Sequence, residues 1–323
     1  MVLRKRKHKK SKLKFYLSGV VHQLTPRVIV SLIYKRLLRK LESSDKNYIE
    51  NRVKYYMRCD APFSLSSNAV SIKDLGPRTV ESAYYYDMLE VSRFFPKARF
   101  DYLFGDITHV PDVPSFLKSR PINNENQNSI LLKLNKVRHF NFIEDDMSYE
   151  DKVDKIVWRG KSFTTHHRYD VCRKYFNAPN CDIALSNPAK RTYETDFTRG
   201  RMSISEQLKN KFILSMEGND VATNLKWIMS SSSLCFMRKP RYEAWFMEGA
   251  LIPDFHYVLL NDDFSDLLEK VTFFIENPES AKEIIANANE YVQQFFDEER
   301  ERLISLLVMK KYIELSREPV IIK

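Results

Sequence analysis

The sequence predicts an α/β fold built from more than one domain. Short apolar runs alternate with helical patterns from residue 98 to residue 276, as is typical of parallel sheets. A chain of 323 residues fits two domains of ordinary size, and its 43% hydrophobic residues are enough for sizeable cores. After Pro278 the pattern is helical almost to the end, which predicts a long C-terminal helical segment. This composition excludes disorder and a multi-span membrane protein.

The amino terminus holds the positive charge of the protein. The chain has a formal net charge of +10, yet thirteen basic residues and no acidic one precede Glu42, so the remainder is close to neutral. Residues 27–41 have the pattern of an amphipathic helix. Its apolar stripe consists of Val30, Ile33, Tyr34, Leu37, Leu38 and Leu41, and its other side carries Lys35, Arg36, Arg39 and Lys40.

Two interpretations of residues 1–41 stay open. The helix packs on the body of the protein, or it lies on an anionic membrane surface with the basic tail beside it. We expect no nucleic-acid partner, because the body has no basic patch interleaved with aromatic residues. Residues 15–24 are too short and too polar for a membrane span, and no signal-peptide cleavage site follows them. We therefore expect a cytoplasmic protein that is peripheral at the inner face of the cell membrane.

The first half of the chain alternates short elements with polar turns. A helical stretch over residues 79–95 precedes a strand over 98–104, which ends in Gly105-Asp106. A loop with several prolines then spans residues 111–121, and residues 130–134 have the pattern of another strand.

The second half alternates more regularly. A strand over residues 155–158 ends in Arg159-Gly160, and a helix begins near His166. The later elements are strands over 212–216, 233–237 and 256–260, with helices over 221–229, 242–248 and 263–276.

Three of the seven glycines follow predicted strands directly. Gly105, Gly160 and Gly218 stand where α/β proteins bind ligands, at the carboxyl ends of strands. Each alone is typical of an ordinary turn. Together with the polar neighbours Asp106, Arg159 and Asn219 they indicate one cleft. Neither a dinucleotide fingerprint nor a P-loop is present.

Arg159 at a strand end and Arg168 at the next helix suit a diphosphate, because a guanidinium binds phosphate oxygens bidentately. The alternative for either residue is a surface salt bridge. Metal-ligand spacing is missing, and Asp145-Asp146 is not the aspartate triplet of metal-dependent sugar transferases. The four scattered cysteines favour a reducing compartment.

A series of motifs, in order along the chain, resembles glycosyltransferase family 90, most closely its bacterial branch. The resemblance covers roughly residues 80–300. Its main part is the run from Lys211 to Trp227, continued by residues 242–248, 253–257 and 262–267. The upstream matches are Gly105-Asp106, residues 118–122, residues 132–135, Arg138-His139 and residues 158–160.

This resemblance implies a GT-B fold, in which two Rossmann-like domains face a central cleft, and a metal-free transfer from a UDP-sugar with inversion. It implies that Asp106 is the catalytic base, that Arg159 contacts phosphate and that Gly218 belongs to the donor loop. Asn224 departs from the eukaryotic members, which have an arginine there. We expect Lys226 to supply the missing charge.

The remaining site residues follow from the same resemblance and from the chemistry of the fold class. Glu243 or Glu248 is expected to hold the ribose hydroxyls, although Glu248 alone is also explained as a surface charge. The full set of expected donor contacts is Arg159, Gly160, Arg168, Gly218, Asn219, Asn224, Lys226, Glu243 and Glu248. The expected acceptor or donor contacts are Lys118, Ser119 and Arg120.

The predicted function is an inverting, metal-independent transfer of a hexose to a hydroxyl of lipopolysaccharide or another surface glycan. No cofactor is expected, and the partners are a UDP-sugar, the glycan acceptor and an anionic membrane surface. The alternative is a catalytically inactive carbohydrate- or nucleotide-binding protein of the same fold. The expected domains are a tail and helix (1–41), an acceptor and base domain (42–152), a nucleotide-sugar domain (153–290) and C-terminal helices (291–323).

Overall fold

The computed structural model describes residues 11–42, 45–76, 80–161, 166–186 and 197–316. The described chain forms two compact units. The sheet unit contains residues 139–241 and 249–294. Of the described residues, the N-terminal unit contains Ser11 to Arg138, residues 242–248 and Phe295 to Ser316.

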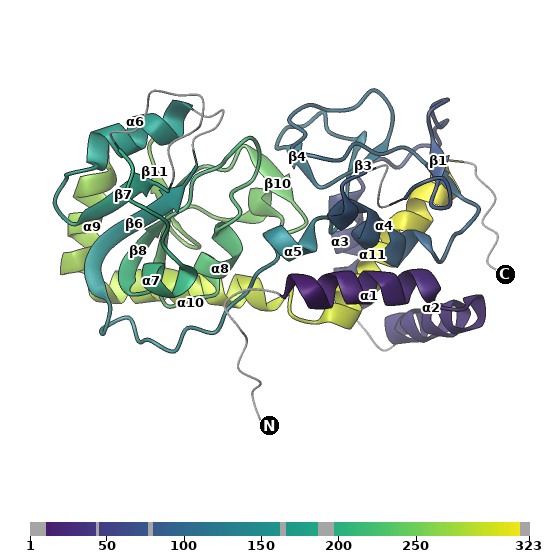
Figure 1. Cartoon of the computed structure of the whole chain (residues 1–323), viewed down its shortest axis with the longest axis horizontal. Helices are drawn as coiled ribbons and strands as arrows, with labels where there is room; N and C mark the ends of the chain where they lie inside the picture. Colours follow the sequence, from purple (N-terminus) through teal and green to yellow (C-terminus); the bar gives the residue numbers. More distant parts are fainter. Residues whose placement is uncertain (1–10, 43–44, 77–79, 162–165, 187–196, 317–323) are drawn as a thin grey trace. The chain divides into compact units, whose positions relative to one another are not determined.

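A five-stranded parallel sheet forms the centre of the sheet unit (Figure 1), with the strand order β11-β9-β8-β6-β7. The strands are β6 (Val153–Gly160), β7 (Cys181–Leu185), β8 (Asn210–Leu214), β9 (Leu234–Arg238) and β11 (Val258–Leu260). The first of these strands, β6, lies between β7 and β8, so the chain changes winding direction between β6 and β8. Sheets of this type bind ligands at such a switch point, beyond the carboxyl ends of the strands.

Helices cover the sheet because its strands are apolar on both faces, as parallel strands usually are. One face packs on α6, α9 and the start of α10 through residues such as Trp158, Val171 and Phe274. On β9, α8 and α10 make further contacts. The helices of this unit are α6 (His166–Tyr175), α7 (Ile204–Gln207), α8 (Leu225–Met229), α9 (Leu267–Glu276) and α10 (Pro278–Gln293).

The N-terminal unit is a helical assembly with short strands. Its helices are α1 (Lys12–Leu24), α2 (Arg27–Glu42), α3 (Lys46–Tyr56), α4 (Ser82–Ser92) and α11 (Glu298–Leu315). The short helices α5 (Lys136–His139) and η1 (Glu248–Ala250) lie at boundaries between the units. Its strands are β1 (Val70–Ser71), β2 (Arg99–Phe100), β3 (Ser115–Leu117), β4 (Ser119–Pro121), β5 (Ser129–Leu131) and β10 (Tyr242–Ala244).

These strands form three separate pairs among the described residues: β1 with β2, β4 with β10, and the parallel pair β3 with β5. The structure confirms the predicted α/β class through the large sheet. The second Rossmann-like sheet expected in the first half is not seen in the described part of the chain. The helix expected over residues 242–248 is wrong, since Tyr242–Ala244 is the strand β10, antiparallel to β4.

The unit boundaries also differ from the expected ones. The sheet unit begins at His139 rather than at residue 153, and the chain returns to the N-terminal unit at Phe295 rather than forming a separate segment. On this return Tyr312 in α11 donates a hydrogen bond to the Pro114 carbonyl (2.8 Å) and accepts one from the Asp101 N–H (3.0 Å). The last helix is therefore part of the core of the N-terminal unit.

The structure decides how α2 packs. Tyr34 and Leu37, from the predicted apolar stripe, are buried, and Lys40 forms an ion pair with Asp297 (3.0 Å). The helix therefore packs on the body of its unit. Within the described residues, none of the helices combines the length and the apolar character needed to cross a bilayer.

Candidate active site

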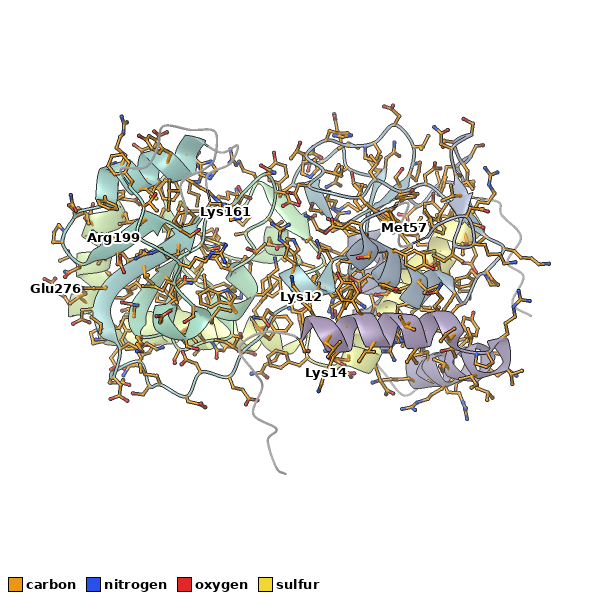
Figure 2. The ribbon with its side chains drawn as sticks, viewed as in Figure 1. Lys12, Lys14, Met57, Lys161, Arg199 and Glu276 are labelled. Atoms are coloured by element: carbon orange, nitrogen blue, oxygen red, sulfur yellow. The ribbon has the colours of Figure 1, made fainter. Side chains whose placement is uncertain are left out.

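The switch point of the sheet brings together residues from three predicted motifs. Arg159 and Gly160 end β6, Gly218 lies in the loop that follows β8, and Arg168 is in the first turn of α6. The neighbouring loop residues Lys161 and Arg199 are labelled in Figure 2. Arg159, Gly160 and Gly218 therefore lie at one edge of this sheet. Gly105 and Asp106, which the predicted cleft also included, belong to the N-terminal unit, so the single cleft stays a prediction.

Arg168 connects the loops that follow the two strands. Its Nε and Nη2 donate to the carbonyls of Glu217 (2.9 Å) and Met216 (2.7 Å), both just beyond β8. Its Nη1 donates to the Lys161 carbonyl (2.9 Å), just beyond β6. The guanidinium also lies over the Trp158 ring, 5.5 Å from the ring centre. Arg168 therefore shapes the edge of the site as well as adding positive charge to it.

Close approach requires a glycine at position 160 and makes the space at Gly218 tight. A Cβ on Gly160 would overlap the Trp158 ring, and a Cβ on Gly218 would lie 3.2 Å from Nη2 of Arg168. The backbone comes this near only because neither residue has a side chain. These glycines allow the Trp158–Arg168 stack and the loop beside it.

Arg159 has mostly internal partners. Its side chain is 6% exposed, and it donates to the Asp182 carboxylate (2.6 Å), the Asp182 carbonyl (2.6 Å) and the Arg199 carbonyl (3.0 Å). Burial alone would raise the pKa of Asp182, but hydrogen bonds from Arg159 and Arg199 outweigh burial and hold this pKa below its ordinary value. Arg159 thus ties β6 to β7. Its contact with phosphate remains a prediction.

The loop after β8 is fixed by Asn224. Its amide nitrogen donates to the Leu214 carbonyl (3.0 Å), and its amide oxygen accepts from the Ser215 hydroxyl (3.2 Å). Asn219 is exposed, whereas Lys226 is fully buried. In this conformation Lys226 does not reach a ligand at the surface, because α8 places its side chain in the interior. The expected replacement of a phosphate-binding arginine by Lys226 therefore has no support here.

Three further residues at this edge were not among the predicted ones: His167, Arg238 and Arg241. The His167 ring nitrogen Nε2 contacts the Glu217 carbonyl at 3.1 Å. Burial first, and then the positive charges of Arg238, Arg168 and Arg241, lower the pKa of His167 to about 4. The three arginines add positive potential to this edge, and that potential favours an anion.

Arg238 has a buried guanidinium nitrogen that is available to a ligand. It ends β9, and its Nη1 donates to the Asp262 carbonyl (3.1 Å). Its Nη2 is buried and has no hydrogen-bond partner within the described residues. A buried N–H that lacks a partner costs free energy unless a ligand or water completes it. The sequence signal was present in the Arg238-Lys239-Pro240-Arg241 run directly after a strand.

The N-terminal unit holds Asp106. Gly105 has a φ of +116°, which L-residues rarely adopt, and open space where a Cβ would stand. A glycine is needed at position 105 because of the backbone turn and not because of packing. Asp106 is 28% exposed and forms an ion pair with the buried Lys118, whose Nζ lies 2.5 Å from Oδ1. The predicted base is thus held at the surface by a buried ammonium group.

A cavity of about 940 Å³ lies beside Gly105. Tyr102 and Phe104 line it together with Asp101, His109 and Asp112. Apolar ring faces with a few polar groups are typical of small-molecule pockets. This pocket is in the same unit as Asp106.

The other residues expected near Asp106 are buried. Arg120 donates to Glu243 (2.8 Å) and to the carbonyls of Ser129 (3.0 Å) and Tyr55 (2.7 Å), and both Arg120 and Glu243 are 0% exposed. Tyr55 donates its hydroxyl to the other carboxylate oxygen of Glu243. This network joins β4 to β10.

Ser119 and Glu248 are buried as well, and Glu248 accepts a hydrogen bond from the Ala244 N–H (2.7 Å). Of the predicted contacts Lys118, Ser119 and Arg120, Lys118 bonds to Asp106. Glu243 and Glu248 are inside the protein, so the structure gives the expected ribose contact no support.

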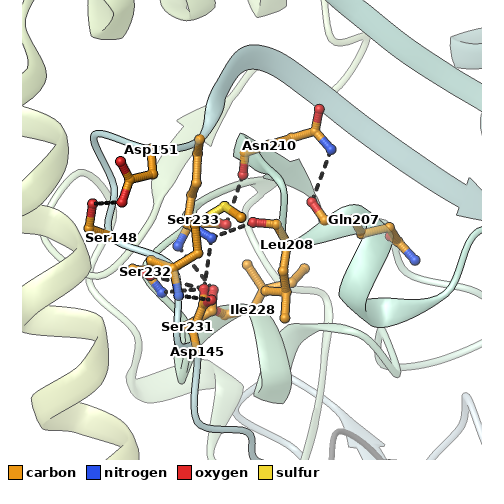
Figure 3. A network of polar contacts seen from close by, with 12 residues as sticks. Asp145, Ser148, Asp151, Gln207, Leu208, Asn210, Ile228, Ser231, Ser232 and Ser233 are labelled. Carbon is orange, nitrogen blue, oxygen red and sulfur yellow. Dashed lines mark hydrogen bonds and ion pairs between the residues drawn. The ribbon is translucent and has the colours of Figure 1, made fainter.

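The opposite edge of the sheet carries a structural cluster (Figure 3). Asp145 accepts from Lys152 Nζ (2.8 Å), from the Ser232 N–H (3.1 Å) and from its hydroxyl (2.9 Å). Ser233 donates to the Asn210 carbonyl (2.8 Å). These contacts hold the amino ends of β6, β8 and β9 together, away from the switch point. Within the described residues, no group of His, Cys, Asp and Glu side chains has the arrangement to hold a metal ion.

Comparisons with known proteins found a matching family profile and several similar chains. The sequence profile of glycosyl transferase family 90 matches residues 132–322. O-glucosyltransferase LpsA from Dichelobacter nodosus is 43% identical over 310 residues, which are 94% of this chain and 96% of that protein. Protein O-glucosyltransferase 2 from Danio rerio is 25% identical over 148 residues, 45% of this chain and 29% of that protein. Among solved structures, the C-terminal domain of a glycosyl transferase group 1 family protein (LpcC) from Francisella tularensis has a TM-score of 0.32 at 10% identity. The match covers 44% of this chain and 85% of that one, and a score this low does not define the fold.

Proposed function

Because the chain belongs to glycosyl transferase family 90, we propose that it is an inverting, metal-independent glycosyltransferase that moves a glucose-type hexose from a UDP-sugar to a hydroxyl. The observation that carries the proposal is the positive edge of the sheet at the switch point. Arg168 and Arg238 meet there, and one buried N–H of Arg238 lacks a partner among the described residues. The diphosphate of a nucleotide sugar is the anion that this edge would bind.

The departing UDP needs positive charge, and in this proposal protein groups supply it. Guanidinium groups fixed in place stabilise the charge that develops on the leaving diphosphate. Arg238 would donate directly, whereas Arg168 would act from its fixed position between the loops after β6 and β8. The contact between Arg159 and phosphate stays part of the proposal on the strength of the family resemblance. The sheet unit would then be the donor domain of a GT-B enzyme, and the N-terminal unit its acceptor domain.

Asp106 would be the catalytic base. An inverting transfer needs one group that removes the proton from the acceptor hydroxyl as this hydroxyl attacks the anomeric carbon. The carbon–oxygen bond to UDP breaks as the new glycosidic bond forms, and the proton passes to the Asp106 carboxylate. Lys118 would position that carboxylate, and the cavity beside Gly105 would receive the acceptor.

The acceptor and the location complete the proposal. The similar Dichelobacter nodosus protein is named O-glucosyltransferase LpsA, which favours lipopolysaccharide or a related surface glycan as the acceptor. An enzyme acting on a lipid-linked glycan would work at the cytoplasmic face of the cell membrane, as a peripheral protein.

The test is a combined binding and transfer experiment. A thermal-shift screen with UDP-glucose, UDP-galactose, UDP-xylose and UDP-N-acetylglucosamine identifies the donor, because a ligand at about 100 times its dissociation constant stabilises by about 2.7 kcal/mol. Transfer is then measured with and without EDTA for the wild type and for Asp106→Asn. We expect transfer that survives EDTA, and a loss of about a hundredfold or more in the variant with UDP affinity retained.

Three results would contradict parts of the proposal. A strict requirement for a divalent metal would overturn the metal-free mechanism. Near-normal turnover of Asp106→Asn would make Asp106 structural. UDP binding without turnover on any acceptor would identify the protein as an inactive nucleotide-binding member of the family.

A further inference from the structure

Exposed large apolar side chains gather on one short stretch of the N-terminal unit. Thirteen large hydrophobic residues are exposed in the described part of the chain, and nine of them lie between residues 13 and 32. Leu13, Leu24 and Val28 are the most exposed, at 70%, 74% and 73%. The other six are Tyr16, Leu17, Val20, Val21, Ile29 and Leu32. Contiguous apolar surface of this kind marks an interaction site.

The exposed residues of α1 form one face of the helix. Leu13, Leu17, Val20, Val21 and Leu24 recur at intervals of four, three, one and three, which places all five on one stripe. They are not exposed because α1 is detached from its unit. Its other side packs on α4, where Gly19 is buried and a Cβ there would overlap the Tyr86 ring.

Exposed apolar side chains occur at the start of α2 as well. Only three residues separate Leu24 from Val28, and Val28 and Leu32 lie one turn apart on the exposed side of α2. The next exposed residues on that side are Lys35, Arg36 and Arg39. The exposed side of α2 is thus apolar in its first two turns and basic afterwards.

The charged residues of this stretch of sequence are all basic, although Arg36 pairs with Glu299 of α11. Lys12 and Lys14 stand at the start of α1 (Figure 2), and Arg27 begins α2. No acidic residue precedes Glu42. An apolar stripe bordered by lysine and arginine is the composition of helices that lie in the interface of an anionic bilayer.

We propose that the exposed face of α1 and of the first two turns of α2 docks on an anionic lipid surface. The apolar stripe predicted from sequence faces the protein: Tyr34 and Leu37 are buried, and Val30, Ile33, Leu38 and Leu41 are half-buried. The membrane face is instead the opposite side of α2 together with the whole apolar stripe of α1. The side chains of this face would enter the boundary between headgroups and acyl chains, while the basic residues contact lipid phosphates. The role of this docking, which is to hold the enzyme near a lipid-linked acceptor, rests on the proposed function, whereas the docking itself does not.

The test uses the full chain and vesicles of phosphatidylcholine, alone or mixed with phosphatidylglycerol. The double variant Leu17→Gln, Val21→Gln changes two side chains that are 57% and 62% exposed, so its melting temperature should equal that of the wild type. The matched control is Ile252→Gln, Phe255→Gln, which changes two similarly exposed apolar residues (55% and 47%) of the sheet unit. The basic tail is unchanged in both variants.

We expect the wild type and the control to bind the mixed vesicles, and the α1 variant to bind at least about tenfold less. The variant Lys35→Gln, Arg39→Gln should lose affinity only for the vesicles with phosphatidylglycerol. UDP affinity, measured in parallel, should be unchanged in every variant, so a failure of the proposed function is seen separately from a failure of docking.

Two outcomes would overturn the inference. If the α1 variant binds mixed vesicles as well as the wild type does, the basic tail alone causes binding and the apolar face has no part in it. If the wild type sediments as a dimer that the α1 variant converts to a monomer, with no vesicle binding by either, the face serves a second copy of this chain.

Discussion

Arg238 is the residue on which donor recognition in our proposal depends most directly. It lies at the end of β9, and its buried Nη2 has no partner among the described residues. We expect Arg238→Ala to weaken UDP binding and transfer together by about tenfold to a hundredfold, because a charged hydrogen bond to phosphate contributes about 1.5–3 kcal/mol. Titration calorimetry with UDP measures the first effect, and transfer kinetics the second.

A matched arginine provides the control. Arg173 in α6 is 65% exposed and pairs only loosely with Asp170, at 3.8 Å. Arg173→Ala should leave UDP affinity unchanged. Equal effects of the two substitutions, or none from Arg238→Ala, would mean that the diphosphate binds elsewhere.

Gly105 gives a second prediction at the scale of one residue. Its φ of +116° costs an alanine about 1–3 kcal/mol, although the space for a methyl group is empty. We expect Gly105→Ala to reduce transfer strongly, since a relaxed turn would move Asp106, and to leave UDP affinity as it was. Gly200→Ala is the control, because Gly200 has similar open space without a positive φ. If both variants transfer at the wild-type rate, the turn at Gly105 does not position the base.

His167 makes a pH-dependent prediction. Its pKa falls from 6.5 to about 4 in the folded protein, chiefly through burial. Between these two values the unfolded chain binds the proton and the folded chain does not, so stability falls as the pH is lowered from 6.5 towards 4. Below about 4 this contribution no longer changes. The pKa of His22 is lowered to about 4 as well, with burial as the main cause and Arg93 as the next, and it acts in the same direction.

Melting temperatures across this range measure the effect. We expect His167→Gln and His22→Gln each to flatten part of the decline, and the double variant to flatten more of it. A decline of unchanged slope in the double variant would assign the acid sensitivity to carboxylates instead.

At the scale of an element, the Asp145–Lys152 pair at the amino ends of the strands should affect stability and not UDP binding. Asp145 is 6% exposed and pairs with Lys152, which is fully buried, while also binding Ser232. Asp145→Ala would leave a buried ammonium without its carboxylate, a loss of about 3–5 kcal/mol for pairs of this kind. We expect a lower unfolding free energy by chemical denaturation, with UDP affinity per folded molecule unchanged. A loss of UDP affinity without a loss of stability would place this edge in the site.

Elements whose sequence signal is local were predicted, and elements that depend on long-range pairing were not. The strands around Phe212–Leu214 and Leu234–Met237 were expected, because continuous apolar runs between turns identify buried parallel strands. The strand β10 was not, because its form depends on pairing with β4, more than a hundred residues earlier. The packing of α2 stayed open because the same amphipathic pattern suits a protein core and a membrane surface.

For the candidate site, the sequence indicated where residues lie along the sheet but not which of them are buried. Glycine and arginine after strands indicated that Arg159, Gly160 and Gly218 share one sheet edge, since parallel strands end on one side. Burial was not readable from sequence: Lys226, Glu243 and Glu248 were expected to contact the donor, and all three are buried. Arg238 was missed for the converse reason: only the structure distinguishes a buried guanidinium N–H from a solvated one.

The division of the whole molecule could not be read in chain order. The N-terminal unit is completed by residues 242–248 and by the chain from Phe295 onward, which are separated in sequence from its main part. A boundary drawn from composition treats the chain as consecutive pieces. Only long-range contacts, such as those of Tyr312 with Pro114 and Asp101, show that the last helix closes the first unit.

Glu301 in α11 allows a test of this division in the intact protein. It is 2% exposed and accepts hydrogen bonds from Arg52 (2.9 Å) and from the indole N–H of Trp245 (2.5 Å). These three residues come from the three separate segments of the N-terminal unit. Glu301→Ala leaves Arg52 buried without its carboxylate, which costs about 3–5 kcal/mol in comparable pairs. We expect this substitution to destabilise the N-terminal unit and to abolish transfer at elevated temperature. UDP binding should persist, since the donor edge is in the sheet unit.

Calorimetric unfolding with and without UDP is the measurement. Two transitions should appear in the variant, and UDP should raise only the upper one, because a ligand stabilises the unit that binds it. Glu301→Gln is the control: it can still accept from Trp245 but lacks the charge opposite Arg52, so its lower transition should lie between those of the wild type and Glu301→Ala. A single transition that UDP raises in all three proteins would mean that the two units unfold as one. The C-terminal helix would then stabilise the donor site as strongly as it stabilises the unit that contains Asp106.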